Sequence, residues 1–179
     1  MIKRLFFILI LTILGIPFVY AQEFEEHIPS IIPYPVHFIA GEGEFVFTEK
    51  TVLVLESQEM EKVAEDFIAL FTHAAKFTPK LKVGSKKGNL CLKLDTSLED
   101  EAYVLDIKPD KIVIRTSGVK GAFYALQTLR QLLPPEIEGG AENEAVVWSV
   151  PAVCITDKPR FAYRGVMVDV ARYFIKKEH

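Results

Sequence analysis

The chain has 179 residues, of which 50% are hydrophobic and 25% charged, and its formal net charge at pH 7 is -3. This composition is typical of a globular protein and excludes disordered and collagen-like classes. The acidic balance argues against a nucleic-acid-binding protein, which usually carries a basic face. The length suits one domain, or one domain with part of another.

Residues 1–21 have the pattern of a secretory signal peptide. Lys3 and Arg4 precede an apolar run, and Val19-Tyr20-Ala21 offers a small-x-small cleavage site before Gln22. An uncleaved membrane anchor is the alternative, but the run is short beside the roughly 20 apolar residues that span a bilayer. We therefore expect an exported protein, in the periplasm, at the cell surface or outside the cell, with no membrane association after cleavage.

The two cysteines, Cys91 and Cys154, each lie in an apolar stretch that is typical of a strand. Free thiols that behave as small buried hydrophobic residues are the favoured interpretation. A disulfide stays open, because the sequence does not supply the geometry that a disulfide needs. The four histidines are scattered, and no histidine or cysteine has metal-ligand spacing. We expect no metal and no other cofactor.

The first half of the remaining chain predicts an extended entry, short strands and one helix. The prolines in 28–36 disfavour helix and favour an extended path. Short strands are expected at 45–47 and 51–55. Residues 58–77 predict an amphipathic helix, because their apolar residues recur with a 3.6-residue period.

The second half predicts a strand, a hairpin, a second helix and two further strands. The strand is expected at 90–94, and apolar residues that alternate in 103–107 and 111–115 predict the hairpin. Residues 119–133 predict the helix, with Ser117 placed to cap it and Pro134-Pro135 to end it. The last two strands are expected at 146–148 and 153–155.

Residues 22–157 are therefore predicted to form an α+β domain, a mixed or antiparallel sheet with two helices on one face. The chemistry of this domain appears inert in the sequence. It has no Gly-rich phosphate loop, no nucleophile elbow and no paired carboxylates in an apolar setting. The acidic stretch Glu99-Asp100-Glu101 is most simply interpreted as a solvated turn.

Three stretches of the sequence together resemble glycoside hydrolase family 20, the β-N-acetylhexosaminidases. The first is Ile31-Ile32-Pro33-Tyr34-Pro35. The second is Tyr103-x-Leu105-x-Ile107, followed by Ser117-Gly118-Val119-Lys120-Gly121-Ala122-Phe123-Tyr124-Ala125-Leu126-Gln127-Thr128-Leu129-Arg130-Gln131-Leu132. The third is Ile155-x-Asp157-x-Pro159-Arg160-Phe161-x-Tyr163-Arg164-Gly165-x-x-x-Asp169-x-Ala171-Arg172-Tyr173-Phe174, which is similar to the domain junction and first barrel strand of that family.

The resemblance implies a domain layout and a mechanism. Residues 22–157 would be the N-terminal domain, and residues 158–179 the beginning of a catalytic (β/α)₈ (TIM) barrel, so that the chain is a fragment. In the family the 2-acetamido oxygen of the sugar attacks the anomeric carbon, which departs from the scheme with an enzyme nucleophile. An Asp orients the acetamido group and a Glu protonates the leaving oxygen. This pair follows the fourth barrel strand, so no catalytic residue is expected within this chain and the fragment is expected to be inactive alone.

The resemblance also assigns one substrate contact, Arg164. Its position matches the family arginine that binds hydroxyls of the terminal sugar, and its fixed fork of donors suits vicinal hydroxyls. The alternative is an arginine paired with an acidic neighbour at the domain junction. Asp169 and Arg172 are expected to support the pocket as an ion pair or brace. Tyr173 departs from the histidine often found there.

Three interpretations of the whole chain follow. The favoured one is the front of a secreted exo-β-N-acetylhexosaminidase, which releases terminal N-acetylglucosamine or N-acetylgalactosamine from a glycan or chitooligosaccharide. The second is a different glycosidase that shares the N-terminal domain. The third is a non-catalytic carbohydrate-binding or interaction domain. None of them implies a nucleic-acid partner.

Overall fold

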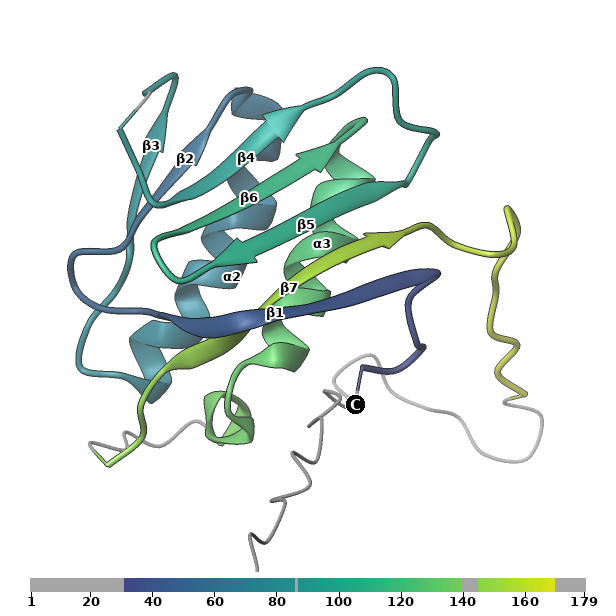
Figure 1. Ribbon diagram of the computed structural model, residues 1–179. Helices are drawn as coiled ribbons and strands as arrows, with labels where there is room; N and C mark the ends of the chain where they lie inside the picture. The colour runs from purple at the N-terminus through teal and green to yellow at the C-terminus, as the bar shows by residue number, and fades with distance from the viewer. Residues whose placement is uncertain (1–30, 86, 140–144, 170–179) are drawn as a thin grey trace, which may run out of the picture.

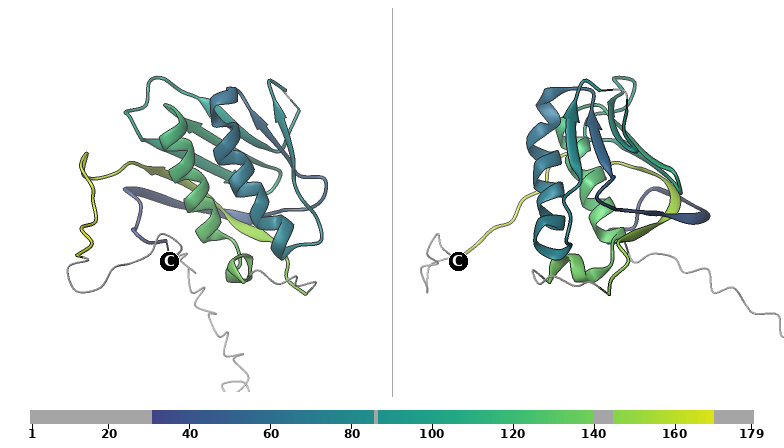
Figure 2. Two further views of the ribbon diagram at one scale, coloured as in Figure 1. Left: turned by 180° about the vertical axis from the view of Figure 1, so that it is seen from behind. Right: turned by 90° about the vertical axis from the view of Figure 1, so that its left-hand side faces the viewer.

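Alternating apolar residues place one face of a seven-stranded sheet against two helices (Figures 1 and 2). The computed structural model describes residues 31–85, 87–139 and 145–169. The expected signal peptide, residues 1–21, lies outside the described residues. Within them, no helix is both long and apolar enough to cross a bilayer.

The sheet is mixed, as the sequence predicted. Its strands lie in the order β1-β7-β5-β6-β4-β2-β3. The pairs β2–β3, β2–β4 and β4–β6 are parallel, whereas β5–β6, β5–β7 and β1–β7 are antiparallel. The strands are β1 (His37–Val46), β2 (Val52–Leu55), β3 (Lys80–Val83), β4 (Leu90–Leu94), β5 (Tyr103–Lys108), β6 (Lys111–Thr116) and β7 (Ser149–Asp157).

Both predicted helices are confirmed, and they lie side by side on one face of the sheet (Figure 2). They are α2 (Glu61–Ala74) and α3 (Val119–Leu132), with short 3₁₀ turns η1 (Gln58–Met60) and η2 (Pro135–Glu138) beside them. Their apolar stripes complete the core. In the core Phe71, which is fully buried, contacts the rings of Phe47, Phe67 and Trp148.

Four local predictions differ from the structure. The first strand is longer than expected, since β1 begins at His37 and passes through a bulge between Ala40 and Glu44. The strand expected at 146–148 is wrong, because the continuous strand β7 begins only at Ser149. The first helix ends at Ala74 rather than at residue 77. Strand β3 was not predicted.

Ser117 does not cap α3, so that prediction is wrong. The residue at the N-cap is Gly118, and the side-chain contact comes from Thr116. The Thr116 hydroxyl accepts a hydrogen bond from the Gly118 amide at 3.3 Å and donates to the Gly118 carbonyl at 2.9 Å. The Ser117 hydroxyl is buried and has no hydrogen-bond partner within the described residues. Thr116 is the last residue of β6, and its side chain points toward the helices. Its hydroxyl, rather than that of Ser117, therefore contacts the N-terminus of α3.

The segment after β7 forms no strand over Phe161–Asp169, although a barrel strand was expected there. Its residues are exposed, and no described strand lies beside it. A strand needs a hydrogen-bonded neighbour to satisfy its backbone groups. The assignment of residues 158–179 to a barrel therefore stays a prediction. Both Cys91 and Cys154 are free thiols, as favoured from the sequence.

Candidate functional site

The three motifs of the sequence meet at one end of the sheet. The side-chain amide of Gln131 on α3 makes two hydrogen bonds to the backbone of Ile32, accepting from its amide at 2.9 Å and donating to its carbonyl at 3.2 Å. The Val36 amide donates to the Asp157 carboxylate at the end of β7, at 3.1 Å. These hydrogen bonds thus join the segment before β1 to α3 and to the C-terminal end of β7.

Tyr103 joins this junction to the core. Its hydroxyl lies 2.6 Å from the Thr128 hydroxyl on α3 and donates to the Asp157 carboxylate at 3.3 Å. Tyr103 and Thr128 are both buried. Burial raises the pKa of Tyr103 above its ordinary value, so its hydroxyl stays protonated and available as a donor. One phenol therefore connects β5, α3 and β7.

Replacing Tyr103 with phenylalanine is expected to lower the free energy of unfolding by about 1–2 kcal/mol, because the buried Thr128 hydroxyl and Asp157 each lose a partner. Urea unfolding of the two proteins measures this difference. The matched control is Tyr34→Phe, since Tyr34 is exposed. An equal effect of the two substitutions would show that the buried contacts contribute nothing of their own.

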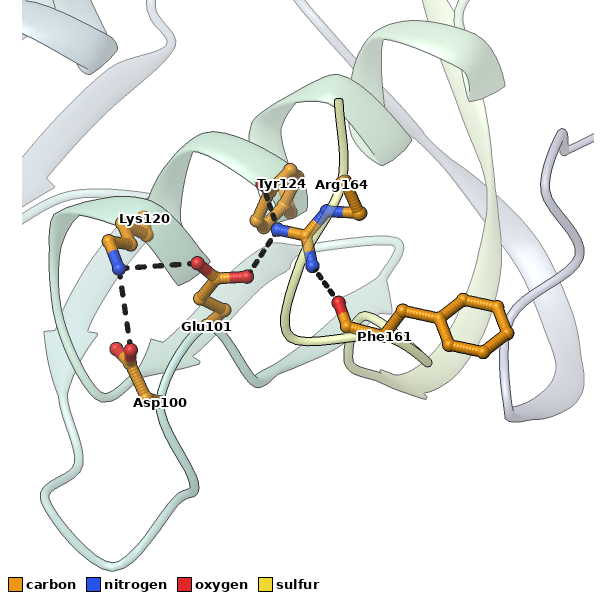
Figure 3. Close-up of polar contacts among 6 residues, drawn as sticks. All are labelled: Asp100, Glu101, Lys120, Tyr124, Phe161 and Arg164. Atoms are coloured by element: carbon orange, nitrogen blue, oxygen red, sulfur yellow. Dashed lines mark hydrogen bonds and ion pairs between the residues drawn. The ribbon is translucent and has the colours of Figure 1, made fainter. Parts of the chain in front are cut away.

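Arg164 lies beside α3, in the segment that follows β7, and contacts both the domain and its own segment (Figure 3). Its Nη2 lies 2.5 Å from Glu101 Oε2 and donates to the Tyr124 hydroxyl at 2.9 Å. Its Nη1 donates to the Phe161 carbonyl. The guanidinium carbon lies 5.7 Å from the centroid of the Tyr124 ring, which adds a cation–π contact. The structure thus contains the pairing with an acidic neighbour that the sequence left open for Arg164.

The acidic turn before β5 forms most of this contact surface. Glu99 pairs with Lys158 at 2.5 Å, Asp100 lies 3.4 Å from Lys120 Nζ, and Glu101 binds both Lys120, at 3.2 Å, and Arg164. The stretch is a turn, as predicted, and Glu99 and Asp100 are exposed, but Glu101 is only 17% exposed and is not solvated. Two of its three carboxylates hold the segment after β7.

Glu101 is the central residue of this cluster. Its backbone lies in the left-handed region, with φ of 65°, and its side chain is only 17% exposed. The hydrogen bond from Arg164, with a further contribution from Lys120, lowers the pKa of Glu101 below its ordinary value, although desolvation opposes the shift. The same contacts raise the pKa of Arg164 and of Lys120.

This depressed pKa predicts a pH dependence. The contribution of Glu101 to stability is present above the ordinary glutamate pKa of about 4.3 and is lost as pH falls through the lower folded value. A carboxyl NMR titration is expected to give Glu101 a pKa below the ordinary range, and Arg164→Ala is expected to raise it. An unchanged Glu101 titration in Arg164→Ala would contradict the pairing.

The remaining predicted site residues are only partly described. Asp169 is exposed, and Arg172 lies outside the described residues. Their support of a pocket stays a prediction. The sequence reasoning missed Glu101 and Tyr124, which are 63 and 40 residues from Arg164. Among the described residues, no group of three His, Cys, Asp or Glu side chains could hold a metal ion.

The described residues form an α+β domain, and ion pairs connect this domain to the segment that follows β7. Residues 28–158 match the family model described as Glycosyl hydrolase family 20, domain 2. The chain belongs to glycoside hydrolase family 20.

Named relatives agree with this assignment. The chain is 33% identical over 154 residues to a beta-hexosaminidase of Porphyromonas gingivalis, with 83% of this chain and 20% of that protein covered. It is 32% identical over 152 residues to an N,N'-diacetylchitobiase of Vibrio harveyi, with 83% of this chain and 16% of that protein covered. The chain thus spans about a fifth of the length of the curated relatives it matches.

A solved structure shares the fold. The N-acetyl-beta-hexosaminidase of Streptomyces plicatus is 31% identical, with a TM-score of 0.74, and the match covers 81% of this chain and 29% of that one. The predicted fold class is thereby confirmed, and the relatives place the domain in a family of glycoside hydrolases.

Proposed function

We propose that the chain is the front part of a secreted exo-β-N-acetylhexosaminidase that removes terminal N-acetylglucosamine or N-acetylgalactosamine from glycans or chitooligosaccharides. The match of residues 28–158 to domain 2 of family 20 is the observation that carries the proposal. The Arg164–Arg172 motif supports it, because this motif resembles the first barrel strand of hexosaminidases.

In this proposal the described domain supports the catalysis without performing it. The sugar's own 2-acetamido oxygen is the nucleophile, and an Asp–Glu pair beyond this chain orients that group and protonates the leaving oxygen. Arg164 supplies charge-assisted hydrogen bonds to hydroxyls of the terminal sugar, because a guanidinium has several fixed donors and stays charged. The domain anchors the segment that carries Arg164 through the Glu99–Lys158 ion pair.

The decisive experiment determines the reading frame past residue 179 and assays the protein it encodes. An Asp–Glu pair after a fourth barrel strand and hydrolysis of an aryl β-N-acetylglucosaminide by the full-length protein are expected. The 179-residue chain is expected to show no turnover of the same substrate. Absence of the pair, or turnover by the short chain, would overturn this division of roles.

Export is part of the proposal, and residues 1–21 support it through their signal-peptide pattern. The expected mature protein begins at Gln22. N-terminal sequencing of the protein recovered from the exported fraction tests this directly. Recovery from the membrane fraction with Met1 intact would favour the uncleaved anchor instead.

A further inference from the structure

No described helix covers the face of the sheet that points away from α2 and α3. Figure 1 shows this face toward the viewer, and the right-hand view of Figure 2 shows both helices on the opposite side. Near β2 the connection from β3 to β4 lies against it, with Gly88 in contact with Val54. The period of two in the strands divides the side chains between the two faces. In β6, Ile112 and Ile114 point into the core, whereas Lys111, Val113 and Arg115 alternate with them on the other face.

This open face is strongly basic. Six cationic side chains share it, namely Lys80 and Lys82 on β3, Lys93 on β4, Lys108 on β5, and Lys111 and Arg115 on β6. We call these residues the basic sheet face. Acidic residues on this face include Asp106, on β5, whose carboxylate lies 3.5 Å from Lys108 Nζ, and Glu44, on the edge strand β1, which accepts a hydrogen bond from Ser149. The excess of positive charge here contrasts with the chain's formal net charge of -3.

The internal structure leaves most of these cations available. Apart from the Lys108–Asp106 pair, no ion pair within the described residues involves a member of the basic sheet face. Asp95, at the end of β4, interacts electrostatically with Arg115 but forms no ion pair with it, and its carboxylate accepts hydrogen bonds from Ser97. Cations that are not used to stabilise the fold can bind an external anion.

The strand register sets the spacing of the charges. Arg115 is directly opposite Lys93 on the neighbouring strand. Adjacent strands lie about 4.8 Å apart, and alternate residues along a strand about 6.7 Å apart, so the cations are spread over the face rather than gathered in a single pocket. Between them the face has short apolar side chains, among them Val54, Cys91 and Val113. Such an array is suited to an extended polymer with repeated negative charges.

We propose that the basic sheet face binds an acidic polysaccharide, a glycan chain that carries carboxylate or sulfate groups. The choice of a glycan rests on the proposed function, since a secreted hexosaminidase meets such chains on its substrates. Binding there holds the enzyme on a charged glycan matrix while a separate site removes terminal sugars.

The distribution of apolar residues favours a glycan over an anionic membrane. Peripheral membrane binding combines basic residues with large apolar side chains that insert into the lipid. On this face the large exposed apolar residues are Ile39 and Val46, both on the edge strand β1 and away from the cations of β3, β4 and β6. The aromatic residues Phe161 and Tyr163 are exposed, but they lie in the segment that follows β7, which leaves the sheet at its end (Figure 1).

The test measures binding of the protein to heparin, a sulfated polysaccharide, by titration calorimetry in low salt. The double variant Lys93→Glu/Arg115→Glu is expected to weaken binding at least about tenfold, because it removes two attractive charges and adds two repulsive ones. The matched control Lys50→Glu/Lys62→Glu makes the same change in net charge at exposed positions off this face, in the turn before β2 and on α2. It is expected to change the Kd less than about twofold, and the unfolding temperatures of both variants confirm that each is folded.

Three outcomes would overturn the proposal. They are an absence of heparin binding by the unmutated protein, an equal loss in the control variant, and binding to phosphatidylserine vesicles or duplex DNA as tight as binding to heparin. The calorimetric readout does not depend on turnover. Heparin binding by a protein that fails the hydrolysis assay would therefore refute the proposed function alone, and hydrolysis without heparin binding would refute this inference alone.

Discussion

Replacing Arg164 with alanine is expected to lower kcat/KM of the proposed full-length hexosaminidase by about 100-fold or more. Hydrogen bonds from a charged donor contribute about 1.5–3 kcal/mol each, and the guanidinium can give two of them to neighbouring hydroxyls. A factor of ten corresponds to about 1.4 kcal/mol, so the loss of two such bonds accounts for this decrease. The measurement is steady-state kinetics with an aryl β-N-acetylglucosaminide.

Two further variants separate a sugar contact from a purely structural ion pair. Glu101→Gln removes the charge that Arg164 contacts in the described structure, at 2.5 Å, but leaves the arginine in place. If Arg164 binds the sugar, Glu101→Gln is expected to lower kcat/KM by at most a few-fold. Arg164→Lys is expected to recover only part of the activity, because an ammonium group keeps the charge but lacks the fixed fork of donors.

The opposite pattern would refute the role of Arg164 at the substrate. Equal losses of kcat/KM in Glu101→Gln and Arg164→Ala, together with equal losses of thermal stability, would show that the arginine acts only through its ion pair. An unchanged kcat/KM in Arg164→Ala would refute the sugar contact on its own.

The periodic elements of the fold could be predicted from the sequence, because their hydrophobic patterns are long enough to identify a face. Helices α2 and α3 and the β5–β6 hairpin each bury a regular apolar stripe. Strand β3, Lys80–Val83, alternates Lys-Leu-Lys-Val, but four residues are too few to identify a strand. Three of them are exposed, and they form a strand because β2 offers a parallel edge to pair with. A strand that forms because of pairing with its neighbour is difficult to predict from its own residues.

The sequence motif around Arg164 could be recognised, but the residues that contact Arg164 in space could not be predicted. The sequence identified Arg164, because the residues around it resemble a family pattern. Its partners Glu101 and Tyr124 lie on the turn before β5 and on α3, and only the sheet order brings them to the segment after β7. An acidic turn is usually solvated, so no local signal separated Glu101 from its neighbours.

At Gly121 there is a clear local signal, but it predicts the wrong sign for the change in stability on substitution. A glycine inside a helix is destabilising relative to alanine by about 1 kcal/mol, so helix propensity alone predicts that Gly121→Ala stabilises the protein. In the structure a Cβ at this position would lie 2.5 Å from the Ala102 carbonyl oxygen and would also collide with the Thr116 hydroxyl. The glycine therefore permits close contact between α3 and the strands beneath it.

Gly121→Ala is expected to lower the free energy of unfolding by about 2 kcal/mol, because overpacking costs typically about 1–3 kcal/mol and can cost more against a backbone atom. The loss should appear in urea unfolding as a lower midpoint with an unchanged slope. Gly139→Ala is the matched control, since its Cβ would meet its nearest atom at 3.4 Å, an ordinary contact. A Gly121→Ala protein as stable as the unmutated one would show that α3 can move away from β5 and β6 without cost. In that case the helix could also shift Tyr124 away from Arg164, and the junction would be less rigid than its hydrogen bonds indicate.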